Sequence, residues 1–320
     1  MAFIEMRGIT KTFPGVVALD NVDFDCDEGR VHGLIGENGA GKSTLIKTLN
    51  GEYRPDGGSI LLDGKPVEMI SPARAMRRGI SVIHQEFNLI NQLSIAKNIF
   101  LGREPAGFLG RVNFGKLYRD SAELLGRVGL ENLDPRTEVW ELNIERKQLV
   151  EVAKALSAEA RLIVMDEPTA ALNGEEVGRL FTLIRGLIRD GRGVIFVSHR
   201  MEEVFAVSDV ITVLRDGKVI DTKETKDLTP EIAVRLMTGK EQISRRLTGK
   251  SPEAETLLRI SGYSVPGVFR NFNLTLRAGE IIGLVGLEGQ GQRDVLRALF
   301  GRLEEHTSAL QSRQSISYAV

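Results

Sequence analysis

Eight consecutive residues, GENGAGKS from Gly36 to Ser43, have the composition of a phosphate-binding loop. They match G-x-x-x-x-G-K-[ST], directly after the apolar run VHGLI and before TLIKTL. Glycines let backbone N–H groups converge on phosphate oxygens, Lys42 can reach the β- and γ-phosphates, and the Ser43 hydroxyl can ligate magnesium. The sequence therefore predicts a site for ATP and Mg²⁺ at these residues: Gly36, Glu37, Asn38, Gly39, Ala40, Gly41, Lys42, Ser43 and Thr44.

Two acidic residues and a histidine follow later apolar runs. Asp166 and Glu167 end the run LIVMDE, and His199 follows GVIFVS. If these runs form neighbouring parallel strands, their carboxyl ends meet beside the phosphate loop. Asp166 then suits magnesium, Glu167 suits the attacking water, and His199 lies near the γ-phosphate. Paired acids alone are often a solvated turn, and a lone histidine is more often structural; the loop upstream is what favours the catalytic interpretation.

Gln85 and Phe13 give weaker signals. Gln85 closes the strand-like run SVIHQ and could touch magnesium or the attacking water, and Phe13 in KTFPG could stack on adenine. For each of them a purely structural role stays open. The other histidines, His32 and His84 in strand-like runs and His306 in a polar tail, are interpreted as structural or solvated.

The elements that must position these residues alternate between strand and helix patterns. SVIHQ, RLIVMDE and GVIFVSH are short apolar runs that end in polar groups, as is typical of buried parallel strands. This predicts an α/β domain of the P-loop NTPase class, with helices on both faces of its sheet. Apolar stripes at helical spacing over about 87–156 predict an inserted helical subdomain. Asp216-Gly217 in VITVLRDGKVIDTKE predicts a hairpin and an antiparallel β edge.

The chain begins the same domain twice. GRVHGLIGENGAGKSTLIKTLNG from Gly29 recurs in outline as GEIIGLVGLEGQGQRDVLRALFG from Gly279. Gln292 and Arg293 stand where the first copy has its lysine and serine, which removes the γ-phosphate cation and the magnesium hydroxyl. The second loop should therefore hydrolyse nucleotide poorly.

The repeat sets the expected domain boundaries. We expect a first nucleotide-binding domain over 1–240, a polar linker over 241–256, the incomplete start of a second domain over 257–302 and an irregular tail over 303–320. The second copy is too short to build what the first copy builds. The hypothesis is a truncated or frameshifted chain that folds up to about residue 240, with its C-terminal residues, about 60 to 80 of them, poorly ordered.

Composition excludes several classes of protein. The 42 Lys and Arg nearly cancel the 43 Asp and Glu, so no basic excess indicates a nucleic-acid partner. The lone Cys26 cannot form an intrachain disulfide and is interpreted as a small buried hydrophobe. No apolar stretch approaches the length of a membrane span and the first residues lack a signal-peptide pattern, so we expect neither a span nor a secretion signal.

The motifs together resemble the ATP-binding subunits of ABC transporters, over residues 4 to about 240. The tandem arrangement, VEVAKAL, and GLVGLEGQGQRD with its missing lysine are similar to the twin-domain ATPases of bacterial monosaccharide importers. The resemblance implies magnesium-dependent ATP hydrolysis that drives import of a sugar or sugar-like solute. It implies integral membrane permease subunits and a solute-binding protein as partners, with no nucleic acid. It also implies a peripheral position on the cytoplasmic face of the bacterial inner membrane.

One motif departs from the family pattern. The signature loop, usually similar to LSGGQ, reads LNIER from Leu142 to Arg146. Asn143 can still cap the helix that follows. Glu145, however, adds a negative charge where small residues let a phosphate approach a helix N-terminus.

Three alternatives stay open beside the transport ATPase. The chain could be a nucleotide-binding module with little or no turnover, because it has one intact phosphate loop and a degenerate signature. An ABC protein that acts on DNA or ribosomes is disfavoured by the formal charge of −1 and the absence of basic runs. A homodimer that pairs Lys42 with the Asn143 loop of a second copy is also conceivable.

Overall fold

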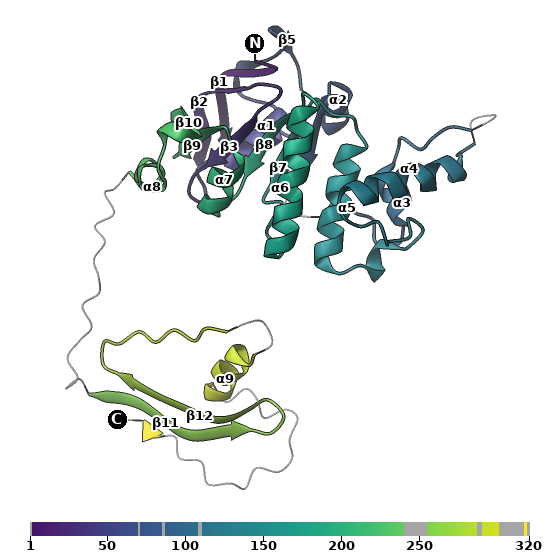
Figure 1. Ribbon diagram of the computed structural model, residues 1–320. Helices are drawn as coiled ribbons and strands as arrows, with labels where there is room; N and C mark the ends of the chain where they lie inside the picture. Colours follow the sequence, from purple (N-terminus) through teal and green to yellow (C-terminus); the bar gives the residue numbers. More distant parts are fainter. Residues whose placement is uncertain are drawn as a thin grey trace. The chain divides into compact units, whose positions relative to one another are not determined.

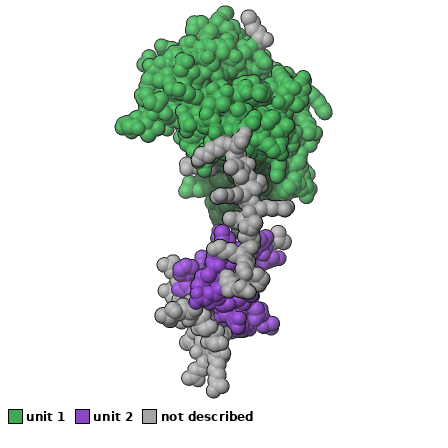
Figure 2. All heavy atoms as spheres, turned by 90° about the vertical axis from the view of Figure 1, so that its left-hand side faces the viewer, with its two compact units in different colours: residues 1–242 green, residues 243–320 purple. Residues whose placement is uncertain are grey.

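The computed structural model describes residues 2–69, 71–84, 87–107, 111–239, 255–286, 290–300 and 317–318. Contacts divide the chain into two compact units, residues 1–242 and residues 243–320 (Figure 2). Each unit has its own sheet structure.

A six-stranded sheet forms the centre of the first unit (Figure 1), in the order β10-β9-β3-β8-β7-β6. Its members are β3 (Val31–Ile35), β6 (Ile80–Ile83), β7 (Leu162–Asp166), β8 (Gly193–Val197), β9 (Val210–Arg215) and β10 (Lys218–Glu224). Five strands pair in parallel, and every residue of β3 and β8 is buried. The prediction of buried parallel strands is confirmed, and β8 lies between β3 and β7 as the site required.

The edge strand β10 pairs with β9 in antiparallel register. Asp216 and Gly217 connect the two strands with φ values of 51° and 75°. Both residues thus adopt the positive φ of a two-residue hairpin turn, in which glycine has no steric cost. The hairpin and the antiparallel edge predicted from the sequence are confirmed.

A second, antiparallel sheet was not resolved by the sequence pattern. It has the order β2-β1-β4-β5 and consists of β1 (Ile4–Phe13), β2 (Val16–Cys26), β4 (Gly57–Leu62) and β5 (Lys65–Val67). Its inner residues form one apolar core with α1 (Lys42–Leu49) and one face of the central sheet. Cys26 belongs to this core, which raises the pKa of its thiol by burial and agrees with its interpretation as a buried hydrophobe.

The opposite face of the central sheet is covered by helices. Residues of α6 (Gly174–Arg189), α7 (Met201–Val207) and α8 (Pro230–Thr238) pack with β3, β7, β8 and β9 into a second apolar core. The short α2 (Pro72–Arg77) precedes β6. The sheet thus has helices on both faces, as predicted.

Three further helices gather on one side of the sheet domain, between β6 and β7 in the chain (Figure 1). They are α3 (Ile95–Ile99), α4 (Phe114–Arg127) and α5 (Ile144–Leu156), with a short 3-10 helix at Val139–Glu141. Their apolar faces join the core that covers the central sheet. The helical segment expected over about 87–156 is therefore present.

Across the described residues, no helix combines the length and the apolar character that crossing a bilayer requires.

The second unit contains an antiparallel hairpin of β11 (Thr256–Val265) and β12 (Phe269–Arg277), followed by α9 (Gln292–Leu299). A two-residue strand, β13 (Ser317–Tyr318), pairs with β11. These elements lie in the part of the chain that was expected to be poorly ordered, and the alternation of side chains in β11 and β12 is typical of paired strands. The rest of the expected tail and residues 241–254 of the expected linker lie outside the described residues.

Candidate functional site

A cavity of about 690 Å³ opens at the carboxyl edge of the central sheet. The loops after β3 and β7 meet there with the residues after β8, because these three strands are adjacent and parallel. The lining contains most of the predicted loop together with both predicted acids and the histidine: Val16, Ala18, Asn38, Gly39, Ala40, Gly41, Lys42, Ser43, Thr44, Asp166, Glu167 and His199.

Close backbone packing shapes the phosphate loop. Gly41 precedes α1 with a left-handed φ of 105°, and a Cβ atom there would lie 2.6 Å from the carbonyl oxygen of Ala18. A Cβ atom on Gly36 would lie 2.5 Å from the carbonyl oxygen of Leu214. Only glycine fits at these two positions, because any side chain would displace the loop from β2 or β9. Asn38 to Gly41 of the loop and the first turn of α1 line the cavity.

Lys42 is the first residue of α1, and its ammonium lies inside the curve of the loop. Its Nζ donates to the carbonyl oxygens of Gly36 and Glu37 at 2.7 and 3.0 Å. Burial lowers the pKa of Lys42, and the charges of Asp166 and Glu167 oppose that effect. A half-buried cation facing two carboxylates at the mouth of a glycine-rich loop is suited to bind a polyphosphate.

Asp166 and Glu167 lie at the end of β7, where the strand delivers them to the cavity. Burial raises the pKa of Asp166, and the neighbouring Glu167 raises it further. Glu167 has a left-handed φ of 51°, which is unusual for a residue with a side chain, and its N–H donates to the carbonyl oxygen of Val197 at 2.9 Å. The backbone conformation of Glu167 is thus held by the neighbouring strand β8.

His199 lies opposite Glu167. Its Nδ1 is 3.3 Å from Oε1 of Glu167, and the side chains are 60% and 21% exposed, respectively. The imidazole is therefore within hydrogen-bond reach of the carboxylate and remains accessible to a ligand in the cavity. The structure brings together His199, Glu167, Asp166 and the loop, which the sequence placed in three distant segments.

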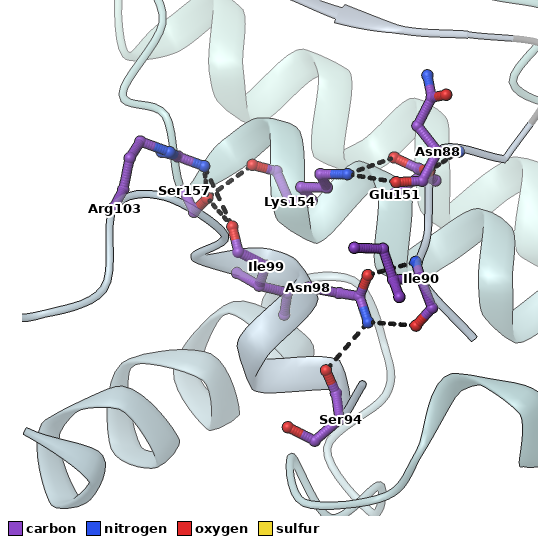
Figure 3. Close-up of polar contacts among 9 residues, drawn as sticks. All are labelled: Asn88, Ile90, Ser94, Asn98, Ile99, Arg103, Glu151, Lys154 and Ser157. Carbon is purple, nitrogen blue, oxygen red and sulfur yellow. Dashed lines mark hydrogen bonds and ion pairs between the residues drawn. The ribbon is translucent and has the colours of Figure 1, made fainter. Parts of the chain in front are cut away.

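Gln85 lies outside the described residues, but the segment that follows it is fixed by a polar network (Figure 3). The N–H of Asn88 donates to Oε1 of Glu151 at 2.5 Å, and Nζ of Lys154 donates to the carbonyl oxygen of Asn88 at 2.7 Å. The buried Asn98 accepts from the N–H of residue 90 and donates to its carbonyl oxygen. The chain after Gln85 is therefore attached to α5, the helix that begins at the expected signature loop.

Phe13 does not line the cavity. Its ring packs edge-on against Tyr53 at 5.2 Å between centroids, and Nζ of Lys11 lies 5.5 Å from its centroid. The lining residues nearest to Phe13 in the sequence are Val16 and Ala18 of β2, and Val16 is 61% exposed. The β1–β2 hairpin thus turns an aliphatic edge to the cavity, which the aromatic signal at Phe13 did not indicate.

The expected signature loop forms the N-terminus of α5. Asn143 is its N-cap and accepts a hydrogen bond from the N–H of Arg146 at 3.0 Å, which confirms the predicted cap. Ile144 is 61% exposed and Glu145 lies in the first turn, where its Oε2 accepts from Asn143. This helix terminus therefore presents an apolar and an acidic side chain.

Two of the other histidines are involved in structural contacts. His32 is buried, its Nε2 lies 2.7 Å from the hydroxyl of Thr212, and burial lowers its pKa to about 4. His84 is 3.5 Å from a carboxylate oxygen of Glu52. His306 lies outside the described residues. The structural interpretation therefore fits His32 and His84.

The amino-acid sequence is similar to a known family and to several known proteins. Residues 19–170 match the ABC transporter family. The chain is 52% identical over 301 residues to ribose import ATP-binding protein RbsA 1 of Rubrobacter xylanophilus, covering 93% of this chain and 59% of that protein. It is 47% identical over 298 residues to ribose import ATP-binding protein RbsA 2 of Streptomyces coelicolor, covering 93% of this chain and 57% of that protein. The chain thus spans less than two thirds of the length of these relatives.

Solved structures share the fold at lower identity. A nucleotide-free ATP-binding cassette from an ABC transporter has a TM-score of 0.63 and 23% identity, covering 78% of this chain and 100% of that chain. A dimeric cassette in a post-hydrolysis state bound to ADP and Pi has a TM-score of 0.63 and 24% identity, covering 69% of this chain and 98% of that chain. These similarities show the P-loop NTPase fold of the cassette.

Proposed function

From the match of residues 19–170 to the ABC transporter family, we propose that the chain binds and hydrolyses ATP to energise import of a sugar or sugar-like solute through a separate permease. The observation that carries the hydrolytic part is the meeting of Lys42, Asp166, Glu167 and His199 in one cavity. The import part is supported by the 52% identity to a ribose import ATP-binding protein.

The donor set fits a magnesium ion beside the phosphates. The hydroxyl of Ser43 and the carboxylate of Asp166 line the same cavity, and hard oxygen ligands of this kind are those that magnesium prefers. When bound, magnesium neutralises negative charge on the phosphates. Gln85 is proposed as a further ligand or water contact from its position in the sequence.

The chain's own groups divide the remaining tasks. The loop N–H groups and Lys42 bind and orient the β- and γ-phosphates, and the ammonium stabilises charge that develops in the transition state. Glu167 polarises the attacking water. His199, at 3.3 Å from Glu167, positions that water against the γ-phosphate. Phe13 stays a proposed contact for adenine from its position in the sequence: its ring packs edge-on against Tyr53, and its side chain is 36% exposed.

The proposed partners are integral membrane permease subunits and a solute-binding protein, with the chain as a peripheral subunit on the cytoplasmic face of the bacterial inner membrane. A second nucleotide-binding domain, in a longer protein or in a homodimer, would complete the site by placing a signature helix over the γ-phosphate. The loop from Leu142 to Arg146 is a poor match for this task, because Ile144 and Glu145 stand at the helix terminus.

Magnesium-dependent binding and turnover of ATP by the purified chain test the proposal. Lys42→Ala should abolish tight binding, and Glu167→Gln should retain binding while turnover falls by about a hundredfold or more. Lys218→Ala serves as a matched control, because Lys218 pairs with Asp20 and does not line the cavity. Turnover that survives Glu167→Gln would contradict the assignment, and tight binding without turnover in the unaltered chain would favour a nucleotide-binding module. Copurification with permease subunits tests the partner.

A further inference from the structure

A buried carboxylate lies outside the cavity lining. Glu203 of α7 is 9% exposed, and its Oε2 accepts hydrogen bonds from the hydroxyls of Thr169 at 2.5 Å and Ser198 at 3.0 Å. Its Oε1 accepts from the guanidinium of Arg200 at 3.0 Å. Thr169 is 1% and Ser198 is 4% exposed, so the carboxylate and both hydroxyls belong to buried residues. A carboxylate buried in this way must be satisfied by its neighbours, and here three donors do so.

The two hydroxyl donors belong to the two segments that carry the proposed reacting groups. Thr169 lies two residues after Glu167, and Ser198 immediately precedes His199. The Ser198 hydroxyl also accepts from the N–H of Arg200 at 3.0 Å, which closes a turn around His199. One carboxylate oxygen therefore fixes the segments after β7 and β8 to each other.

We propose that Glu203 is a positioning residue that sets the separation of Glu167 and His199 by binding Thr169 and Ser198 through one oxygen. The expected effect on turnover rests on the proposed ATPase function. The link between the two segments rests only on the hydrogen bonds. Glu203 does not contact the cavity, so it acts through the two segments that it joins.

Glu167 depends on such an anchor more than most residues do. Its left-handed φ of 51° is a conformation that side chains adopt only where surrounding contacts enforce it. One contact is its own N–H bond to Val197, which directly precedes Ser198. The Thr169–Glu203–Ser198 bridge is a second contact between the same two segments. If the bridge is lost, the β7–β8 ladder and the Glu167 bond to Val197 remain, but the side-chain link through Glu203 between the two segments is gone.

Kinetics of Thr169 variants separate positioning from a general loss of structure. Thr169→Val keeps the side-chain shape and removes the donor, and it should lower kcat by roughly tenfold or more while the KM for ATP changes less than about twofold, because misplaced groups slow chemistry more than binding. Thr169→Ser keeps the donor and should restore kcat. Ser121→Ala is the control: its buried hydroxyl donates to the carbonyl oxygen of Leu117 in α4, outside both segments. An equal loss of kcat in Ser121→Ala, or no rescue by Thr169→Ser, would overturn the proposal.

Hydrogen exchange of Glu203→Gln tests the structural part without turnover. An amide group presents only one oxygen, so it cannot accept from the hydroxyl pair on one side and from Arg200 on the other. We expect faster exchange in residues 166–172 and 197–203 together, with α1 unchanged. Faster exchange in one segment alone, or in neither, would refute the shared anchor. If the unaltered chain lacks turnover, the proposed function fails, whereas the exchange result still decides on the anchor.

Discussion

Replacing Gly41 by alanine should destabilise the chain more than the same change at Gly39. Both glycines have positive φ, 105° and 84°, so each substitution incurs a backbone cost of about 1–2 kcal/mol. A Cβ atom on Gly41 would also lie 2.6 Å from the Ala18 carbonyl oxygen, whereas nothing lies within 4 Å of a Cβ atom on Gly39. Overpacking of this kind costs a further ~1–3 kcal/mol. The free energy of unfolding should therefore fall by ~2–5 kcal/mol at Gly41 and by ~1–2 kcal/mol at Gly39.

Urea unfolding of the two variants without nucleotide measures this difference, followed by circular dichroism and by fluorescence to test for a single transition. The pair is matched in chemistry and lies within one loop, so changes in the unfolded state cancel. Equal destabilisation of the two variants would refute the argument that contact with β2, and not φ alone, requires glycine before α1. A larger effect at Gly39 would refute it more strongly.

Three further outcomes follow from the described contacts. Asp166→Asn should raise the free energy of unfolding at pH 7 while abolishing turnover; because the pKa of Asp166 is raised in the folded state, the gain should shrink as the pH is lowered towards 4 in urea titrations. His32→Gln should flatten the pH dependence of stability. Burial lowers the pKa of His32 from 6.5 to about 4, so between these pH values only the unfolded state binds the proton. The free energy of unfolding of the unaltered chain should therefore fall by up to about 3 kcal/mol as the pH is lowered from 6.5 to 4. Asn143→Ala should lower the free energy of unfolding by about 1 kcal/mol through loss of the cap on the Arg146 N–H.

Residues that act at the ends of buried strands could be predicted from the sequence. Apolar runs such as LIVM and GVIFV identify parallel strands, and polar residues at their carboxyl ends must meet at one edge of the sheet. Asp166, Glu167 and His199 therefore came together with the loop as expected. The same periodicity located the inserted helices and the Asp216-Gly217 turn.

Contacts between side chains of separate segments could not be predicted in this way. Phe13 is three residues before Val16, which lines the cavity, but its ring packs against Tyr53. The sequence around Phe13 does not indicate this contact, because Tyr53 belongs to another segment. Glu203 is one of two adjacent acids in α7, and the sequence predicts a solvated side chain there because acidic residues in helices are normally exposed. Its burial depends on donors from two other segments. Ser198, directly before His199, and Thr169, two residues after Glu167, are the sequence features that together could have indicated a buried acceptor between these segments.

The two glycine-rich loops show that backbone shape and chemistry are specified by different residues. Gly291 precedes α9 with φ 91° and ψ 5°, and Gly41 precedes α1 with φ 105° and ψ 0°. The conformation that starts the helix is thus common to both copies, although Gln292 and Arg293 replace the lysine and serine of the first copy. Loss of the cation and of the hydroxyl therefore leaves the local turn intact. A helix N-terminus can still attract a phosphate by its N–H groups and dipole, whereas charge stabilisation during hydrolysis requires the side chains that only the first loop has.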